Sequence, residues 1–363
     1  MTDWRDLPRG ELTFEMLPPA NLDDSYGTLD GVVLSGCKID EDYYTDARVS
    51  AEIEFVGDRW VRQSAIRITY RVPEMGYEEE LGTFFASDDG SSVEKGARTT
   101  KLKLFSALDA LSRKKGTQHW LAAGCYARSA MRQICESEHR ELVDDGANDH
   151  MYSELSWLDS DKTFLDHMYS LCNDANDRLE VDGHGRIVVG AYVQPSKRTP
   201  CFEIDLNDPR GVAHDGVERS SNYLSMPSEY HIVYRWTEGS GDDAQKKELK
   251  GSAYADGHVS FGARGYTVSE VEVLNDLDPA TEWKAAEIAR ERLDAIVEDV
   301  EWRLDCEYLP IHRGDVGWLK GLQDIPDYAG DKLVMVKSVD LDLETMRMGL
   351  VLKSVHSADW SQE

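Results

Sequence analysis

Two consecutive runs near the end of the chain, Lys332–Leu343 and Glu344–Val355, alternate apolar and polar side chains almost without interruption. Alternation of this kind puts one row of side chains in a core and the other in water, which is typical of half-buried strands. The sequence predicts four elements ahead of these runs: a helix over 279–300, a strand over Trp302–Leu309, a turn over 310–315 and a strand over Val316–Leu319. We therefore expect a mainly antiparallel β domain with one flanking helix.

The N-terminal part of the chain has the same period of two. Apolar and polar residues alternate along Val49–Phe55, Ile66–Val72 and Lys101–Leu104, and the last of these follows an expected loop at Ser87–Gly96. A short helix is predicted at Ser106–Lys114. Several half-buried strands in succession, with turn residues between them, indicate an antiparallel barrel or sandwich.

The middle of the chain changes to the period of helices. One helix is predicted over Ala122–Glu136 and a second from near Ser160, where apolar residues recur on one side. Strands at Arg178–Val181 and Arg186–Val193 follow, and the turn between them has a glycine on each side of His184. Glycine tolerates the positive φ angles of tight turns, so we expect a β-hairpin here.

Further strands are predicted at Tyr230–Trp236, Leu249–Ala255 and Val268–Leu274, with a hairpin tip at Gly239–Gln245. The predicted fold class is α+β, mainly antiparallel β. Three domains are expected: a first β-barrel domain over 1–115, a helical and hairpin connecting domain over 116–216, and a second β-barrel domain over 217–363 that includes the helix at 279–300.

The chain has a formal net charge of −29 over 363 residues. So acidic a surface repels nucleic-acid phosphates and anionic lipids, which argues against a DNA-reading or membrane-binding protein. The charge itself fits solubility, adaptation to salt, or a wall past which DNA slides without sticking. No apolar run is long enough for a transmembrane helix, and the start of the chain lacks the pattern of a signal peptide. We expect the chain to be made and folded in a cytoplasm.

The residue types that carry out chemistry form no catalytic pattern. The cysteines are not spaced for zinc or for a disulfide framework and are predicted to be small buried hydrophobes; they are Cys37, Cys125, Cys135, Cys172, Cys201 and Cys306. The acidic loop 144–149 lacks the twelve-residue calcium signature. His184 has no carboxylate at a defined spacing, and Asp166 and His167 are helix neighbours that point to different faces. The sequence predicts no enzyme, and no catalytic, cofactor-binding or metal-binding residues.

Two further features suggest binding but have simpler explanations. Arg313-Gly314-Asp315 spells an integrin-binding tripeptide, but a glycine between charged residues is also what a tight turn requires. The tryptophans could stack on sugars, but they are spread over the whole chain, which favours core or interface positions; they are Trp4, Trp60, Trp120, Trp157, Trp236, Trp283, Trp302, Trp318 and Trp360.

Segments in the first half of the chain match, in order, the elements of one known protein family. Leu81–Phe85 looks like that family's exposed strand after an early hairpin, and Lys101–Lys114 looks like the close of its first barrel. Ser156-Trp157, the helix at Thr163–Asn173 and then Leu179–Ile187 are similar to its connection from helix to hairpin.

The second half continues this order with Tyr230–Tyr234, Ala285–Val297 and Arg313–Val316, which look like the family's second barrel. Taken together, the chain resembles the baseplate hub proteins of tailed phages: the N-terminal part of siphophage tail-associated proteins and the hub of contractile tails.

This resemblance implies two tail-tube-like β domains linked by a helical insertion, in a homotrimer whose pseudo-sixfold ring joins tail tube to tail tip around the DNA channel. The implied partners are the distal tail or tail-tube ring, tail-tip or fibre subunits, and the tape-measure protein in the lumen. DNA would pass through without specific binding, and the protein would reside in the virion. A virion-associated cell-wall hydrolase or glycan-binding module, and the hub of a phage-derived contractile injection system, are the alternatives.

Overall fold

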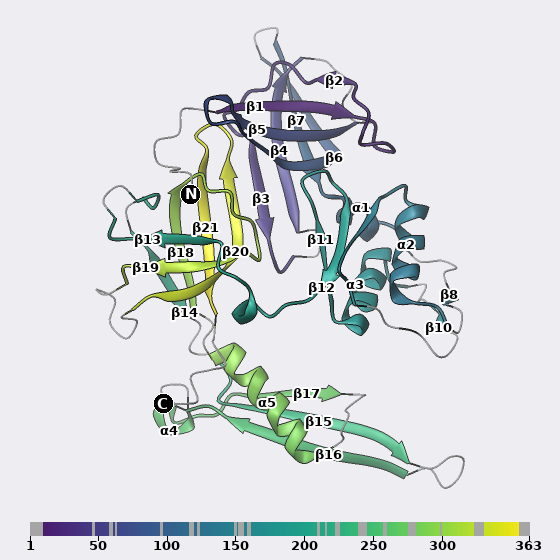
Figure 1. Ribbon diagram of the computed structural model, residues 1–363, viewed down its shortest axis with the longest axis vertical. Helices are drawn as coiled ribbons and strands as arrows, with labels where there is room; N and C mark the ends of the chain where they lie inside the picture. Colours follow the sequence, from purple (N-terminus) through teal and green to yellow (C-terminus); the bar gives the residue numbers. More distant parts are fainter. Residues whose placement is uncertain are drawn as a thin grey trace.

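A computed structural model describes residues 10–45, 48–57, 61, 64–94, 97–115, 120–121, 124–148, 151, 156–157, 161–208, 211–214, 216–221, 226–238, 245–256, 260–274, 281–297, 300–322 and 330–355. The strands in this part of the chain belong to four sheets, and antiparallel pairs predominate (Figure 1). The predicted α+β, mainly antiparallel class is therefore confirmed.

The largest sheet has thirteen strands. Its main path runs β14-β18-β21-β20-β3-β4-β7-β6-β5-β1-β2, with β19 beside β20 and β13 beside β19. The N-terminal strands are β1 (Glu11–Leu17), β2 (Gly27–Thr28), β3 (Lys38–Asp42), β4 (Val49–Val56), β5 (Ala65–Val72), β6 (Tyr77–Glu94) and β7 (Ala97–Phe105). The later strands are β13 (Phe202–Asp205), β14 (Glu218–Ser221), β18 (Val300–Glu307), β19 (Val316–Lys320), β20 (Lys332–Asp342) and β21 (Arg347–Ser354). Among the described strands this path is open, with β14 and β2 at its ends, and closes no barrel.

The two groups of strands meet where β3 pairs antiparallel with β20, from Lys38 opposite Asp342 to Asp42 opposite Ser338. Figure 1 shows this purple strand beside the yellow strands of the C-terminal group. The alternating pattern turns Ile39 and Leu341 inward, and both are almost fully buried. One apolar core runs beneath both groups, so the sheet is continuous across what we call the β3–β20 junction.

Three helices form a second core with a small sheet. The helices are α1 (Ala107–Ser112), α2 (Ala127–Ser137) and α3 (Phe164–Ala175), and the strands are β9 (Leu142–Asp145), β11 (Asp177–Val181) and β12 (Ile187–Ala191). At the start of α3, Thr163 and Asp166 form a capping box that satisfies backbone N–H groups at the helix end. We call these elements the helical unit. The short strands β8 (Trp120–Leu121) and β10 (Ser156–Trp157) pair with each other.

A third core belongs to residues 226–297, which lie between β14 and β18 in the sequence and are called the inserted unit. It contains β15 (Glu229–Glu238), β16 (Gln245–Tyr254), α4 (Phe261–Arg264), β17 (Ser269–Leu274) and α5 (Glu282–Val297). Its sheet has the order β16-β15-β17, and α5 packs across β15 and β16 (Figure 1). At the closest approach Gly251 faces Ala285 and Ala286, where a Cβ atom would collide with the helix. Two turns of 3-10 helix, η2 (Pro73–Met75) and η3 (Pro195–Lys197), complete the described elements.

Most predicted elements are present, and four details were wrong. The expected loop at Ser87–Gly96 is largely strand, because β6 continues to Glu94 and pairs with β7. The helix expected from Ala122 begins at Ala127, and Val300, the expected end of the last helix, already belongs to β18. The segment Leu81–Phe85, expected to be exposed, is buried from Leu81 to Phe84.

The hairpin tip at Gly239–Gln245 lies outside the described residues except for Gln245. None of the helices in the described part of the chain combines the length and apolar composition that crossing a membrane requires.

Candidate functional site

A cluster of charged and hydroxyl groups lies where the turn between β18 and β19 meets three other strands. The turn supplies His312 and Arg313, and β3, β6 and β11 supply Glu41, Glu79 and Glu180. Each glutamate comes from a different part of the chain. We call this set of five residues the junction cluster.

His312 bridges two carboxylates. Its Nδ1 lies 3.0 Å from Oε1 of Glu41, and its Nε2 lies 3.0 Å from Oε1 of Glu79. Glu79 also accepts hydrogen bonds from the hydroxyl groups of Tyr77 and Tyr308. The Tyr308 ring packs edge-on against Tyr70, 5.1 Å between centroids, so apolar packing holds the hydroxyl in place.

Arg313 joins the other two sides of the cluster. Its Nη1 lies 3.2 Å from Oε2 of Glu41, and its Nη2 lies 2.8 Å from Oε2 of Glu180. The exposed fractions of the Arg313, Glu41 and Glu180 side chains are 6%, 7% and 17%. A guanidinium group suits this position because its fixed fork of donors can serve two carboxylates at once.

The conformation of the turn directs the side chains of His312 and Arg313 toward the glutamates of the cluster. Gly314 has φ of 84°, in the left-handed region that favours glycine, and its N–H donates to the carbonyl of Val336 over 2.7 Å. The carboxylate of Asp315 accepts from the backbone N–H of His312 over 2.8 Å. Burial raises the pKa of Asp315 above its usual range.

The charges of the junction cluster stabilise one another. Burial would raise the pKa of Glu41, but hydrogen bonding to His312 and the charges of His312 and Arg313 lower it to about 2. Burial would lower the pKa of His312, but its hydrogen bonds to Glu41 and Glu79 raise it to about 10. For Glu79, hydrogen bonds from His312 and the two tyrosines outweigh burial and lower the pKa. Near neutral pH a protonated His312 therefore lies between ionised Glu41 and Glu79.

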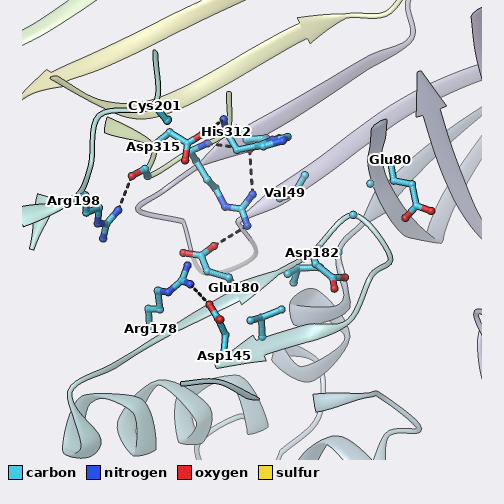
Figure 2. Close-up of a pocket in the computed structure, with 18 of the residues that line it drawn as sticks. Val49, Glu80, Asp145, Arg178, Glu180, Asp182, Arg198, Cys201, His312 and Asp315 are labelled. Atoms are coloured by element: carbon cyan, nitrogen blue, oxygen red, sulfur yellow. Dashed lines mark hydrogen bonds and ion pairs between the residues drawn. The ribbon is translucent and has the colours of Figure 1, made fainter. Parts of the chain in front are cut away.

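Glu41, His312 and Arg313 of the cluster form one wall of a cleft of about 840 Å³. The β11–β12 hairpin forms another wall, and the segment around Arg198 and Cys201 closes the third side (Figure 2). In the close-up Arg178 reaches across the hairpin to Asp145, and their ion pair measures 2.5 Å. Arg198 donates to the carbonyl of Gly314 over 2.6 Å, which ties this segment to the turn. Three arginines at the cleft, Arg178, Arg198 and Arg313, are thus engaged in contacts with the residues of its walls.

A second charged feature lies on the outward face of the β3–β20 junction. Asp40 is directly opposite Asp340, and Gly349 separates Asp340 from Asp305 on β18. This row of three aspartates is called the acidic row. Partial burial raises the pKa of Asp340, and the negative charge of Asp40 raises it further. A hollow of about 410 Å³ lies over the row.

The structure settles several candidates raised by the sequence. Arg313-Gly314-Asp315 is a turn, as predicted, with its arginine buried in ion pairs. Asp166 caps α3, whereas His167 is buried in the same helix, so the two do not act together. His184 does have a carboxylate partner, Glu80, at 2.8 Å, which its sequence spacing could not show.

The acidic loop 144–149 is paired rather than open where the structure describes it. Asp144 lies 2.7 Å from Arg128, and Asp145 pairs with Arg178. Residue 149 lies outside the described part. Within the residues that the structure describes, no group of three or more His, Cys, Asp or Glu side chains is arranged to hold a metal ion.

Four cysteines are buried as predicted, whereas Cys125 is partly exposed and Cys201 is exposed at the cleft. Trp302 is fully buried, and Trp283 and Trp318 are exposed. The structure does not describe the other tryptophan side chains.

No family model matches the sequence, and no curated protein matches it. Solved structures of similar fold do exist. The tail protein from Neisseria meningitidis MC58 is 12% identical, with a TM-score of 0.65 over 94% of this chain and 96% of that chain. The 43 kDa tail protein of prophage MuSo2 from Shewanella oneidensis is 10% identical, with a TM-score of 0.66 over 94% of this chain and 98% of that chain.

The PdpA–VgrG complex of Francisella also contains a similar chain, with 11% identity and a TM-score of 0.58 over 96% of this chain and 59% of that chain. The chain thus resembles phage tail proteins and a VgrG-complex protein over nearly its whole length. At these identities the likeness concerns the fold.

Proposed function

We propose that this chain is a structural hub protein of a phage-type tail, located in the virion at the tail tip or baseplate. The observation that carries the proposal is the likeness to two phage tail proteins over 94% of this chain and at least 96% of theirs. A likeness confined to one β domain would fit many functions, because common folds are reused. Here the likeness extends over nearly the whole of each chain.

The proposed assembly is a homotrimer in which two tail-tube-like β domains per chain give a pseudo-sixfold ring. The two strand groups joined at the β3–β20 junction support this arrangement, since each chain would contribute two neighbouring segments of one ring wall. The strands β14 and β2 end the path in the described residues and offer edges for contact between copies. The ring would join the tail-tube ring to tail-tip or fibre subunits and would surround the tape-measure protein. The domain division 1–115, 116–216 and 217–363 stays part of this proposal.

The acidic row supports the proposed role of the sheet face as a wall of the DNA channel. Aspartates on β3, β20 and β18 cross the junction on the outward face, and the whole chain has a net charge of −29. Carboxylates repel phosphates, so DNA could pass such a surface without binding to it.

Native mass spectrometry and electron microscopy of the purified chain test the assembly. We expect a species of three times the monomer mass and particles with threefold symmetry and a central hole. A chain that stays monomeric at high concentration, both alone and with the tail-tube protein, would contradict the hub assignment.

The likeness to the Francisella VgrG complex supports a second candidate, the hub of a phage-derived contractile injection system. The genes beside this one distinguish the two, because a phage tail is encoded with capsid and DNA-packaging genes. The proposed role requires no catalysis. We expect cell-wall zymography and glycan arrays to be negative, and a positive result in either would favour a hydrolase or glycan-binding module.

A further inference from the structure

The helical unit meets the large sheet through several polar contacts and through Phe85 of β6, which packs against the helical core. Its apolar core is separate from the core beneath the large sheet. At the tip of the β11–β12 hairpin, Thr83 of β6 donates to the carbonyl of Gly183 over 2.8 Å, and His184 pairs with Glu80. Interfaces of this polar kind between units of one chain permit relative motion more readily than apolar ones.

The other attachment of the hairpin is the ion pair between Glu180 and Arg313. It is the most deeply buried charged contact between the hairpin and the large sheet that the described residues show, with exposed fractions of 17% and 6%. Arg313 keeps its second carboxylate, Glu41, on the sheet side of the contact. Loss of Glu180 alone would therefore remove this attachment without leaving the arginine unpaired.

Helix α2 adds a further contact at its end. Arg140 lies over the ring of Phe85, 3.8 Å from its centroid, and donates to the carbonyl of Pro19 over 2.8 Å. Phe85 pairs with Phe105 at the end of β7, so this contact lies near the point where β7 leads into α1, one of the two places where the chain passes between the unit and the sheet. Motion about this link would swing the hairpin away from the junction cluster.

We propose that the Glu180–Arg313 ion pair is a latch that holds the helical unit against the β3–β20 junction, and that the unit undocks as one body when the latch opens. Glu180 on the hairpin and Arg313 on the turn between β18 and β19 both line the 840 Å³ cleft, so moving the hairpin away from the turn widens that cleft. Figure 2 shows Glu180 on the hairpin and His312, the neighbour of Arg313 in the turn. Each side has a core of its own, because the two clusters share no buried residue, and Phe85 of β6 is the large-sheet residue that packs against the helical core in the described part of the chain. This proposal does not depend on trimer formation or on the hub function.

Pulsed electron spin resonance tests the latch in the full chain. Nitroxide amino acids replace Ser170 on α3 and Glu344 in the β20–β21 turn, both exposed, so the six native cysteines stay unchanged. With Glu180 and Arg313 both present, the distance between the two labels should have one narrow distribution. In Glu180→Gln we expect a second, longer population, with the undocked fraction raised at least about tenfold because a buried charge pair has been broken.

Glu203→Gln is the matched control. Glu203 pairs with Lys320 at 2.8 Å, but its side chain is 51% exposed, and the pair lies within the large sheet. The control should keep the unmodified distance distribution. The latch is overturned if Glu180→Gln also keeps it, or if Glu203→Gln broadens it equally. A lower melting temperature in Glu180→Gln with an unchanged distance would also overturn the latch, since the pair would then only stabilise the fold.

Discussion

The β3–β20 junction and the inserted unit are held together by different forces. The junction places five ionisable side chains in and beside the core of the large sheet, and each charge finds a partner. The inserted unit has a small apolar core whose closest contact depends on Gly251 lying against α5. A buried charge cluster is sensitive to the loss of one partner, whereas a tight backbone contact is sensitive to one added methyl group.

The largest effect is expected from Arg313→Met, which leaves Glu41 and Glu180 buried without their shared cation. We expect the free energy of unfolding of the large sheet to fall by about 3–5 kcal/mol, measured by urea denaturation. The inserted unit should keep its protection from hydrogen exchange. Lys320→Met is the control, because its partner Glu203 is largely exposed, and it should lower the free energy of unfolding far less than Arg313→Met does. Equal losses in the two variants would show that burial of the cluster does not matter.

The second expected effect is a pH dependence confined to the junction. The pKa of Glu41 is lowered to about 2, so ionised Glu41 contributes stability above about pH 4.5. This contribution is lost as the pH falls through about 2. The pKa of His312 is raised to about 10, so protonated His312 contributes its full stability below about pH 6.5. This contribution is lost as the pH rises through about 10. The junction should therefore be most stable between about pH 4.5 and 6.5.

Hydrogen exchange at pH 6 and pH 9, corrected for the intrinsic rate, measures this difference region by region. Strands of the junction should lose protection at pH 9, whereas the inserted unit should not. His312→Gln should abolish most of the change. If the inserted unit loses more protection than the junction, the electrostatic account of the comparison is wrong.

The smallest and most local effect is expected from Gly251→Ala. The added methyl group meets Ala285 and Ala286, so α5 must move away from β16, at a cost of about 1–3 kcal/mol. Hydrogen exchange should increase in β15, β16 and α5 while the β3–β20 junction is unaffected. Gly262→Ala is a control in the same unit, because a Cβ atom there has room. A loss of protection spread over the whole chain would mean that the inserted unit is not an independent core.

The sequence predicted most strands and helices because their apolar periodicity reflects burial. It did not predict the strand at Ser87–Glu94, whose polar composition resembles a loop, because backbone pairing with β7 outweighs local preference there. It also did not predict that β3 would pair with β20. Alternation shows which face of a strand is buried, but it does not identify the strand that pairs with it.

The junction cluster was missed because its members come from four separated elements. One signal was present: Glu41 is in phase with Ile39, so the alternating pattern of β3 puts a carboxylate on the buried face. A charge at a buried position requires a partner, which predicts a buried cation elsewhere in the chain. The sequence could not identify Arg313 as that cation, because it lies in a turn that is easily explained by its glycine alone.

The pairing of β3 with β20 also has a consequence for biosynthesis. Roughly 290 residues separate the two strands, so at about 5–20 residues per second β3 emerges from the ribosome roughly 15–60 s before its partner. Until then the nascent N-terminal strands have an open edge at β3, where other strands can pair wrongly. The large sheet can be completed only after almost the whole chain has been translated, whereas the helical unit and the inserted unit can each form their own core earlier.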